Sequence, residues 1–280
     1  MKRLLSFILT LSLCFSAAVF AGCRSGGFNG ITASKEGFML TNEENTKLGS
    51  MLDKLGLEYG FIDSGLDGEE IVRRFEAELE KGRREGYTPV LVIEDQTLCM
   101  QFEAMLNNGY SVKEELKKEP IDAKAFLEQR ISWLESMGFS FDDSTELGIS
   151  FSNNNEKFGG VEAAGMFADS PVRIALVKLP TDKPWEAAIY IPFGGWNECP
   201  SPLEMASVLK LWYEKYGAVP AVITSDTLDM FVSTPVSAES ANELVREQFA
   251  FDMDIAMQGV SLKDYTKMLT NSRIWTFWWD

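Results

Sequence analysis

The sequence contains no histidine. Histidine is the general base in Ser-His-Asp and Cys-His mechanisms, a common zinc ligand, and the side chain whose charge changes nearest neutral pH. Its absence excludes all three roles from this protein. Catalysis would have to use a cysteine thiol or carboxylates, and the sequence predicts no metal site and no cofactor.

Cysteine is scarce as well, with four in the whole chain. Cys14 and Cys23 lie near the N-terminus, which leaves Cys99 and Cys199 for the rest of the protein. Outside the cytoplasm two such thiols can pair, and the bridge would close a long loop. The sequence does not fix the distance between them, so a Cys99–Cys199 disulfide and two free thiols both stand as predictions.

Basic residues are outnumbered, with 26 Lys and Arg against 42 Asp and Glu, a net charge of −16. Residues 1–22 hold two basic residues and no acidic one, so the chain without them carries a net charge of −18. Such a surface repels nucleic-acid phosphates, which excludes a general nucleic-acid-binding protein. Cationic partners remain compatible with it, although acidic residues often serve solubility alone.

The N-terminus has the pattern of an export signal. Lys2 and Arg3 precede residues 4–20, which carry no charge and are rich in Leu, Phe, Ala and Val. A positive start, an apolar stretch and a small-residue exit are typical of a secretory signal peptide. The stretch is short for a membrane span, which needs about 20 apolar residues. We therefore predict that residues 1–22 are a signal peptide.

The exit from this segment reads Phe20-Ala21-Gly22-Cys23. Small residues directly before a cysteine resemble the bacterial lipobox, and the resemblance implies cleavage before Cys23 and a diacylglycerol group on its sulfur. The motif usually has Leu where Phe20 stands, and ordinary cleavage after Ala21 is the alternative. The lipobox interpretation predicts a lipoprotein anchored on the outer, extracytoplasmic face of a bacterial cell membrane, where stable binding takes more than one acyl chain.

Composition divides the remaining chain into three regions. Residues 23–42 contain Gly, Ser and Asn without periodicity and predict a flexible tether, residues 43–171 are helix-rich, and residues 172–280 alternate strand and helix patterns. Short strands between amphipathic helices favour an α+β fold, a mixed α/β arrangement in which a mixed β-sheet is flanked by amphipathic helices. The sequence leaves open whether the second and third regions are one domain or two.

Capping residues mark the predicted helix starts. Asp67, Asp122, Ser201, Ser237 and Ser261 each precede an apolar stripe at helical spacing. The start at Ser201 is the most complete, because Pro and Glu follow at the first and third helical positions. Short apolar runs predict strands at residues 88–93, 172–179, 187–191, 219–223 and 227–232.

A last strand is predicted at the end of the sequence. Its alternation would place Trp275, Phe277 and Trp279 on one face and Trp278 on the other. Two interpretations stand. Either the strand lies inside the sheet with both faces covered, or its aromatic face is a surface for a sugar, peptide or protein.

Six blocks in the third region occur in a recognisable order: residues 194–202, 209–218, 226–228, 248–254, 258–259 and 275–280. Together they resemble the bacterial family catalogued as domain of unknown function 4253, over residues 172–280. The resemblance implies no established activity, cofactor or catalytic residue. Family members often carry Cys-Pro where this chain has Asp252-Met253, so a pairing of that cysteine with Cys199 is ruled out here.

These blocks supply the candidate binding surface: Trp196, Asn197, Cys199, Asp226, Asp254, Gln258, Trp279 and Asp280. The Gly194-Gly195 pair before Trp196 allows a tight turn, which either builds a ligand-facing loop or connects two elements. Cys199 precedes a helix start, where the helix dipole would lower a thiol pKa, although a buried and inert cysteine is the commoner outcome. The acidic residues are too sparse for a Ca²⁺ site, which wants six to eight oxygens.

Two functions are compatible with these features. The first is a membrane-tethered binding or interaction module without catalytic activity, whose partner is an unknown protein or small molecule. The second is a hydrolase-type enzyme that uses Cys199 or the paired carboxylates of Asp226 and Asp254. A cleft with a reactive thiol, or two carboxylates facing each other across a pocket, would favour the enzyme.

Overall fold

The structure is a computed structural model that describes residues 37–41, 46–63, 65–141, 156–167, 172–257 and 261–280. The expected signal peptide, Cys23, most of the tether and Gln258 lie outside these residues. Residues 36–280 form one compact unit. Within the described ranges, none of the helices has the length and apolar character needed to span a bilayer.

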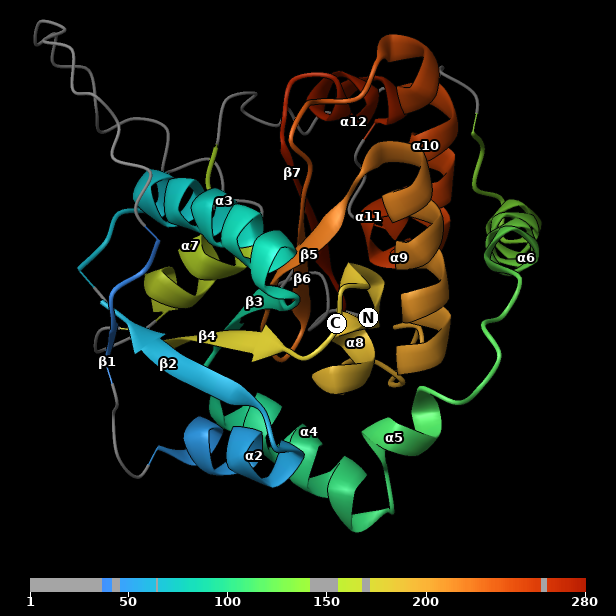
Figure 1. Cartoon of the computed structure of the whole chain (residues 1–280). Helices are drawn as coiled ribbons and strands as arrows, with labels where there is room; N and C mark the ends of the chain where they lie inside the picture. Colours follow the sequence, from blue (N-terminus) through green and yellow to red (C-terminus); the bar gives the residue numbers. More distant parts are fainter. Residues whose placement is uncertain (1–36, 42–45, 64, 142–155, 168–171, 258–260) are drawn as a thin grey trace, which may run out of the picture. The chain divides into compact units, whose positions relative to one another are not determined.

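A seven-stranded sheet runs through this unit in the order β1-β2-β4-β3-β5-β6-β7 (Figure 1). The strands are Leu40–Thr41 (β1), Glu58–Ile62 (β2), Thr88–Ile93 (β3), Ile174–Leu179 (β4), Val219–Ile223 (β5), Thr227–Phe231 (β6) and Ile274–Trp278 (β7). Neighbouring strands are antiparallel except β3 and β5, which are parallel. The sheet is therefore mixed, and the predicted α+β fold is confirmed.

The sheet joins sequence regions that the composition separated. β3 lies between β4 and β5, and it pairs with both. Strands from residues 40–93 and strands from residues 174–278 therefore share one set of backbone hydrogen bonds. β1 pairs with β2 from Leu40, so the sheet starts just before the expected end of the tether.

Helices lie on both sides of the sheet (Figure 1). They are α2 (Lys47–Leu55), α3 (Gly68–Glu85), α4 (Gln96–Asn107), α5 (Val112–Glu115), α6 (Ala123–Ser136), α7 (Gly159–Phe167), the 3-10 turn η1 (Pro184–Glu186), α8 (Ala187–Tyr190), α9 (Pro202–Tyr216), α10 (Ala238–Phe251), α11 (Met253–Met257) and α12 (Leu262–Leu269). The predicted caps at Asp67, Asp122, Ser201, Ser237 and Ser261 all accept backbone hydrogen bonds at the starts of their helices.

Strand alternation divides the core into two layers. Val90 and Val92 of β3 face the larger layer, which α2, α4, α9 and α10 complete. Leu91 and Ile93 face the other layer, which is closed mainly by α3 and by Phe158 just before α7. β3 is buried throughout and apolar after Thr88, which is the pattern of a strand covered on both faces.

The prediction of a strand at residues 187–191 is wrong. These residues form α8 and its end, directly after η1. Pro184 at the start of η1 and the helix-forming Ala187 and Ala188 favour the helical path. Both alanines are buried, and a short apolar run does not by itself distinguish a buried helix from a strand.

Candidate functional site

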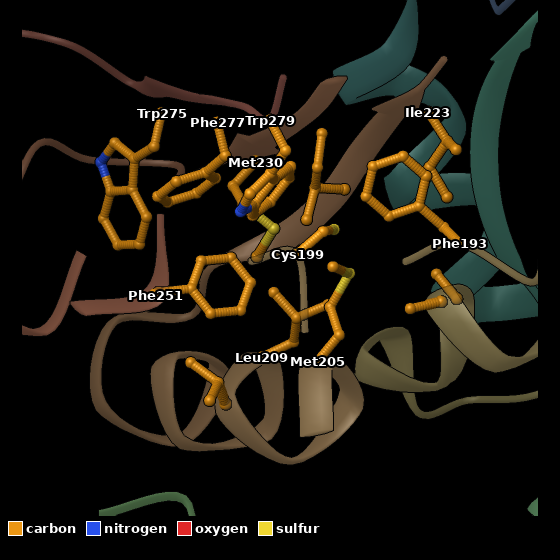
Figure 2. Close-up of a cluster of buried hydrophobic side chains, with 14 of the residues drawn as sticks. Phe193, Cys199, Met205, Leu209, Ile223, Met230, Phe251, Trp275, Phe277 and Trp279 are labelled. Atoms are coloured by element: carbon orange, nitrogen blue, oxygen red, sulfur yellow. The ribbon is translucent and has the colours of Figure 1, made fainter. Parts of the chain in front are cut away.

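Three alternating aromatic side chains of β7 and the residue after it lie in the core. Trp275, Phe277 and Trp279 are at most 1% exposed, and Figure 2 shows their rings in a row beside Phe251. Trp212 of α9 stacks on Phe277 with ring centroids 5.5 Å apart and 15° between the ring planes. Phe251 and Trp279 are in edge contact at 5.5 Å. The row is therefore packing between the sheet and two helices, and its rings, Trp279 among them, are not accessible to a partner.

β7 lies at an edge of the sheet, with β6 as its only neighbour among the described strands. The prediction of an interior strand is therefore wrong. An open edge exposes unpaired backbone groups, and here a buried carboxylate meets one of them. Asp252 Oδ2 accepts a hydrogen bond from the Trp278 N–H at 2.9 Å, and its Oδ1 accepts from the Asp254 N–H at 3.1 Å. Burial, and then the charge of Asp254, raise the pKa of Asp252 well above its ordinary value.

Three predicted site residues converge on the last residues of the sequence. The Asn197 side chain donates to the main-chain oxygen of Asp280 at 2.7 Å. Asp254 Oδ2 accepts from the Asp280 N–H at 3.1 Å, and the carbonyl of Asp226 accepts from the Trp279 N–H at 3.0 Å. These residues lie far apart in the sequence, but the fold collects them around one short segment of the same chain.

The Asp226 carboxylate is occupied by local hydrogen bonds. Its Oδ1 accepts from the hydroxyls of Thr224 and Thr227, each at 3.0 Å. Its Oδ2 accepts from Trp278 Nε1 at 3.2 Å. Asp254 is half-buried, and burial together with the charge of Asp280 raises its pKa. The two carboxylates thus contact different parts of the segment 278–280.

Cys199 lies in a tight loop between α8 and α9. Gly194 adopts a left-handed φ of 95°, and a Cβ there would lie 2.0 Å from the carbonyl oxygen of Pro200, so only glycine fits. The Gly195 N–H donates to the same carbonyl at 3.0 Å, and Asn197 also has a positive φ, of 45°. Figure 2 places Cys199 next to the aromatic row. The loop connects two helices and closes over the thiol.

The thiols of Cys199 and Cys99 are both free and buried, which excludes a disulfide between them in this structure. Burial, reinforced by the negative charge of Asp252, raises the pKa of Cys199 despite a hydrogen bond from the Gly195 N–H. Burial likewise raises the pKa of Cys99 to about 11. The thiolate is the nucleophile, so both cysteines have the character of inert core residues.

Arg130 of α6 connects the loop to the end of α10, and the sequence analysis missed it. Its Nε donates to the carbonyl of Ala250 at 2.5 Å, and its Nη2 donates to the carbonyl of Glu198 at 2.7 Å. A cation at the last carbonyls of a helix also interacts favourably with the helix dipole. Nothing in the spacing of residues in α6 distinguishes Arg130 from a solvated arginine, because both acceptors are main-chain atoms distant in the sequence.

The remaining candidates are divided between surface and undescribed residues. Trp196 is half-buried and contacts Phe193 edge-on at 5.2 Å, while Asn197 and Asp280 are exposed. Gln258 and Cys23 lie outside the described residues. No group of three His, Cys, Asp or Glu side chains among the residues with described positions is arranged to bind a metal ion.

The site therefore belongs to a mixed-sheet α+β domain in which a glycine loop and the end of α10 hold the final strand. Residues 175–280 of this domain match the family described as a domain of unknown function, DUF4253. The matched part contains nearly all of β4 and the whole of β5, β6 and β7, but not β3, which lies between β4 and β5. No curated protein and no solved structure matches the chain.

Proposed function

We propose that the protein is a membrane-tethered lipoprotein whose domain is a binding or interaction module without catalytic activity. One observation supports the proposal that the domain is not catalytic. The polar side chains that could serve catalysis contact the segment 278–280 of the same chain, and the candidate nucleophile Cys199 is buried with a raised pKa. The absence of histidine from the sequence supports the same proposal.

The tether rests on Cys23 and the segment before it. A positive start, an apolar stretch and Ala21-Gly22 before the cysteine support export, cleavage and lipidation on the outer face of a bacterial cell membrane. The test compares Cys23→Ser with the wild type by membrane fractionation and by incorporation of a labelled fatty acid. We expect the variant to lose both the label and membrane attachment. A variant that stays in the membrane fraction would contradict the anchor.

Of the candidate surface, Asn197 and Asp280 are exposed, and Trp196, Asp226 and Asp254 are half-buried. Acidic groups predominate there, so we propose a protein or small-molecule partner and no nucleic acid. The chain from residue 24, immobilised and exposed to envelope extracts, tests this. Trp196→Ala should lose the partner, whereas Trp133→Ala, which changes an exposed tryptophan of α6, should retain it. Equal capture by both variants would place the binding surface elsewhere.

The hydrolase alternative requires an accessible thiol or free carboxylates. Under native conditions we expect neither Cys99 nor Cys199 to react with iodoacetamide at a rate approaching that of an exposed thiol, because both are buried and protonated. Denaturation should restore full reactivity. Rapid alkylation of Cys199 alone in the folded protein would contradict the binding-module proposal and favour a cysteine hydrolase.

A further inference from the structure

One end of the α3 face of the sheet is polar. Asp229 of β6 pairs directly with Thr276 of β7, and by alternation both share the face of Phe231 and Ile274. On β3 and β4 the corresponding positions are apolar, as at Leu91. Asp229 is fully buried. Burying a carboxylate costs free energy unless it accepts hydrogen bonds. The stability of this end of the sheet therefore depends on the groups that donate hydrogen bonds to Asp229.

The N-terminus of α7 supplies these donors. The Gly160 N–H donates to Asp229 Oδ2 at 2.9 Å, and the Gly159 N–H also donates to this carboxylate. The Thr276 hydroxyl donates to Oδ1 at 2.6 Å. A Cβ on Gly159 would lie 2.6 Å from Thr276 Oγ1, so the glycine permits the close approach. A carboxylate at the N-terminus of a helix also interacts favourably with the helix dipole.

The apolar contacts of α7 are only partly buried: Val161 and Ala164 pack against the core layer on this face. Gly160 is its only buried residue among those whose burial is described, and Glu162, Gly165 and Met166 are exposed. Its sequence, GGVEAAGMF, includes glycines that lower helix propensity. The adjacent apolar anchor is Phe158, which is buried against Phe75 with ring centroids 5.5 Å apart. Beyond these apolar contacts, the attachment of α7 to the sheet is polar and is made by the Gly159 and Gly160 N–H groups to Asp229.

We propose that α7 is a reversible cover over the polar end of this sheet face, and that the Asp229 carboxylate controls its attachment. Detachment would expose Asp229, Thr227 and Thr276 to solvent or to a ligand, while Phe158 would keep the start of the segment in place. The cover lies at β6 and β7, within the part of the chain that matches DUF4253, although α7 itself comes from outside that match. This inference is independent of the proposed tether and partner.

Protonation should favour the attached state. Burial raises the pKa of Asp229 from 3.8 to about 6, against the lowering effect of the hydrogen bonds from Thr276, Gly160 and Gly159. In the detached state the carboxylate would face water, with a pKa near the ordinary value. A proton therefore binds more tightly in the attached state, and attachment weakens as the pH rises from about 4 to about 6. The gap corresponds to about a hundredfold change in the attachment equilibrium.

Other charged groups on the surrounding elements have partners of their own. Glu162 of α7 pairs with Lys157 at 3.8 Å. Asp226, in the turn before β6, accepts from Thr224, Thr227 and Trp278. Arg273, just before β7, pairs with Glu76 and Glu156. None of these groups contributes to the raised pKa of Asp229, which leaves its own ionisation as the source of the pH dependence.

Hydrogen exchange measured by mass spectrometry on the chain from residue 24 tests the proposal. Rates between pH 4 and pH 8 are corrected for the intrinsic pH dependence, and residues 159–166 are compared with β4 as an internal reference. In the wild type, we expect protection of α7 to fall by up to about a hundredfold relative to β4 across this range. Parallel behaviour of α7 and β4 would overturn the proposal.

Two variants assign the effect to Asp229. In Asp229→Asn the amide oxygen can still accept from Gly160 and the amide nitrogen can donate to the Thr276 oxygen, but no proton is lost, so the pH dependence should disappear. Glu162→Gln, which removes an exposed carboxylate of the same helix, should retain it. If Asp229→Asn does not fold, Thr276→Val removes a donor to the ionised carboxylate and should move the midpoint to higher pH. A pH dependence that persists in Asp229→Asn, or an unmoved midpoint in Thr276→Val, contradicts the proposal.

Discussion

The two faces of the β6–β7 pair differ in what covers them. On one face, Trp275, Phe277 and Trp279 pack against Trp212 of α9 and Phe251 of α10. The opposite face carries the Asp229–Thr276 pair and is covered by α7 (Figure 1). Apolar burial does not depend on ionisation, whereas hydrogen bonds to a buried carboxylate do.

The comparison indicates that the packing on one face of a sheet edge can be independent of pH while the packing on the other face depends on it. The aromatic rings hold β7 against α9 and α10, so we expect the strand to stay in the sheet when α7 detaches from the opposite face. Most of the predicted site residues lie at the end of the same strand, where Asn197 and Asp254 contact Asp280. Substitutions on either face therefore test whether a change in one core layer leaves the stability of the other unaffected.

The largest effect is expected on the aromatic side. Trp212→Ala removes the stack on Phe277 and the donor to Glu247, and should lower the free energy of unfolding by about 3–5 kcal/mol. Trp133→Ala, at a partly exposed tryptophan of α6, should change it by less than about 0.5 kcal/mol. Urea denaturation measures both. Similar losses in the two variants would contradict the assignment of Trp212 to the core.

An effect of up to about 3 kcal/mol is expected on the polar side, and it should depend on pH. The folded-state pKa of Asp229, about 6, exceeds its ordinary value of 3.8, so the contribution of this group to stability is greatest below about pH 4 and is lost as the pH rises through 6. The free energy of unfolding of the wild type minus that of Asp229→Asn should fall across this window. A constant difference would show that Asp229 does not titrate as described.

A smaller effect, of about 1–3 kcal/mol, is expected at the edge of β7. Asp252→Ala would leave the partly buried N–H groups of Trp278 and Asp254 without their acceptor. Asp252→Asn keeps one acceptor oxygen and should be less destabilising. Urea denaturation of both variants, with hydrogen exchange of residues 276–280, checks this order. An equal loss in the two variants would mean that the hydrogen bonds at the edge contribute little.

Local features could be predicted from the sequence because their causes are local. Ser201 forms the expected capping box with Glu204, and residues 88–93 form the expected buried strand. The alternation at Trp275, Phe277 and Trp279 correctly placed the three rings on one face. Each of these patterns depends on residues that are close together in the sequence, so a short segment is enough to predict it.

Long-range pairing could not be predicted in the same way. β7 is an edge strand because β6 is its only neighbour among the described strands, and β3, from a distant part of the chain, lies between β4 and β5; neither arrangement is marked in the local sequence. Asp229 and Arg130 are missed for a related reason, since their partners are main-chain groups at Gly160, Ala250 and Glu198. A main-chain partner leaves no mark in the composition of either segment, so only the three-dimensional structure reveals the contact.

The most direct test of the difference between the two faces is an NMR pH titration of the Gly160 amide, which donates to Asp229. The chemical shift of this amide should titrate with a midpoint near pH 6, the pKa of the Asp229 carboxyl. The amide of Val177, in the interior strand β4, serves as the reference and should show no inflection there. If Gly160 shows no inflection near pH 6, or if Val177 shows the same one, attachment of α7 is not controlled by Asp229.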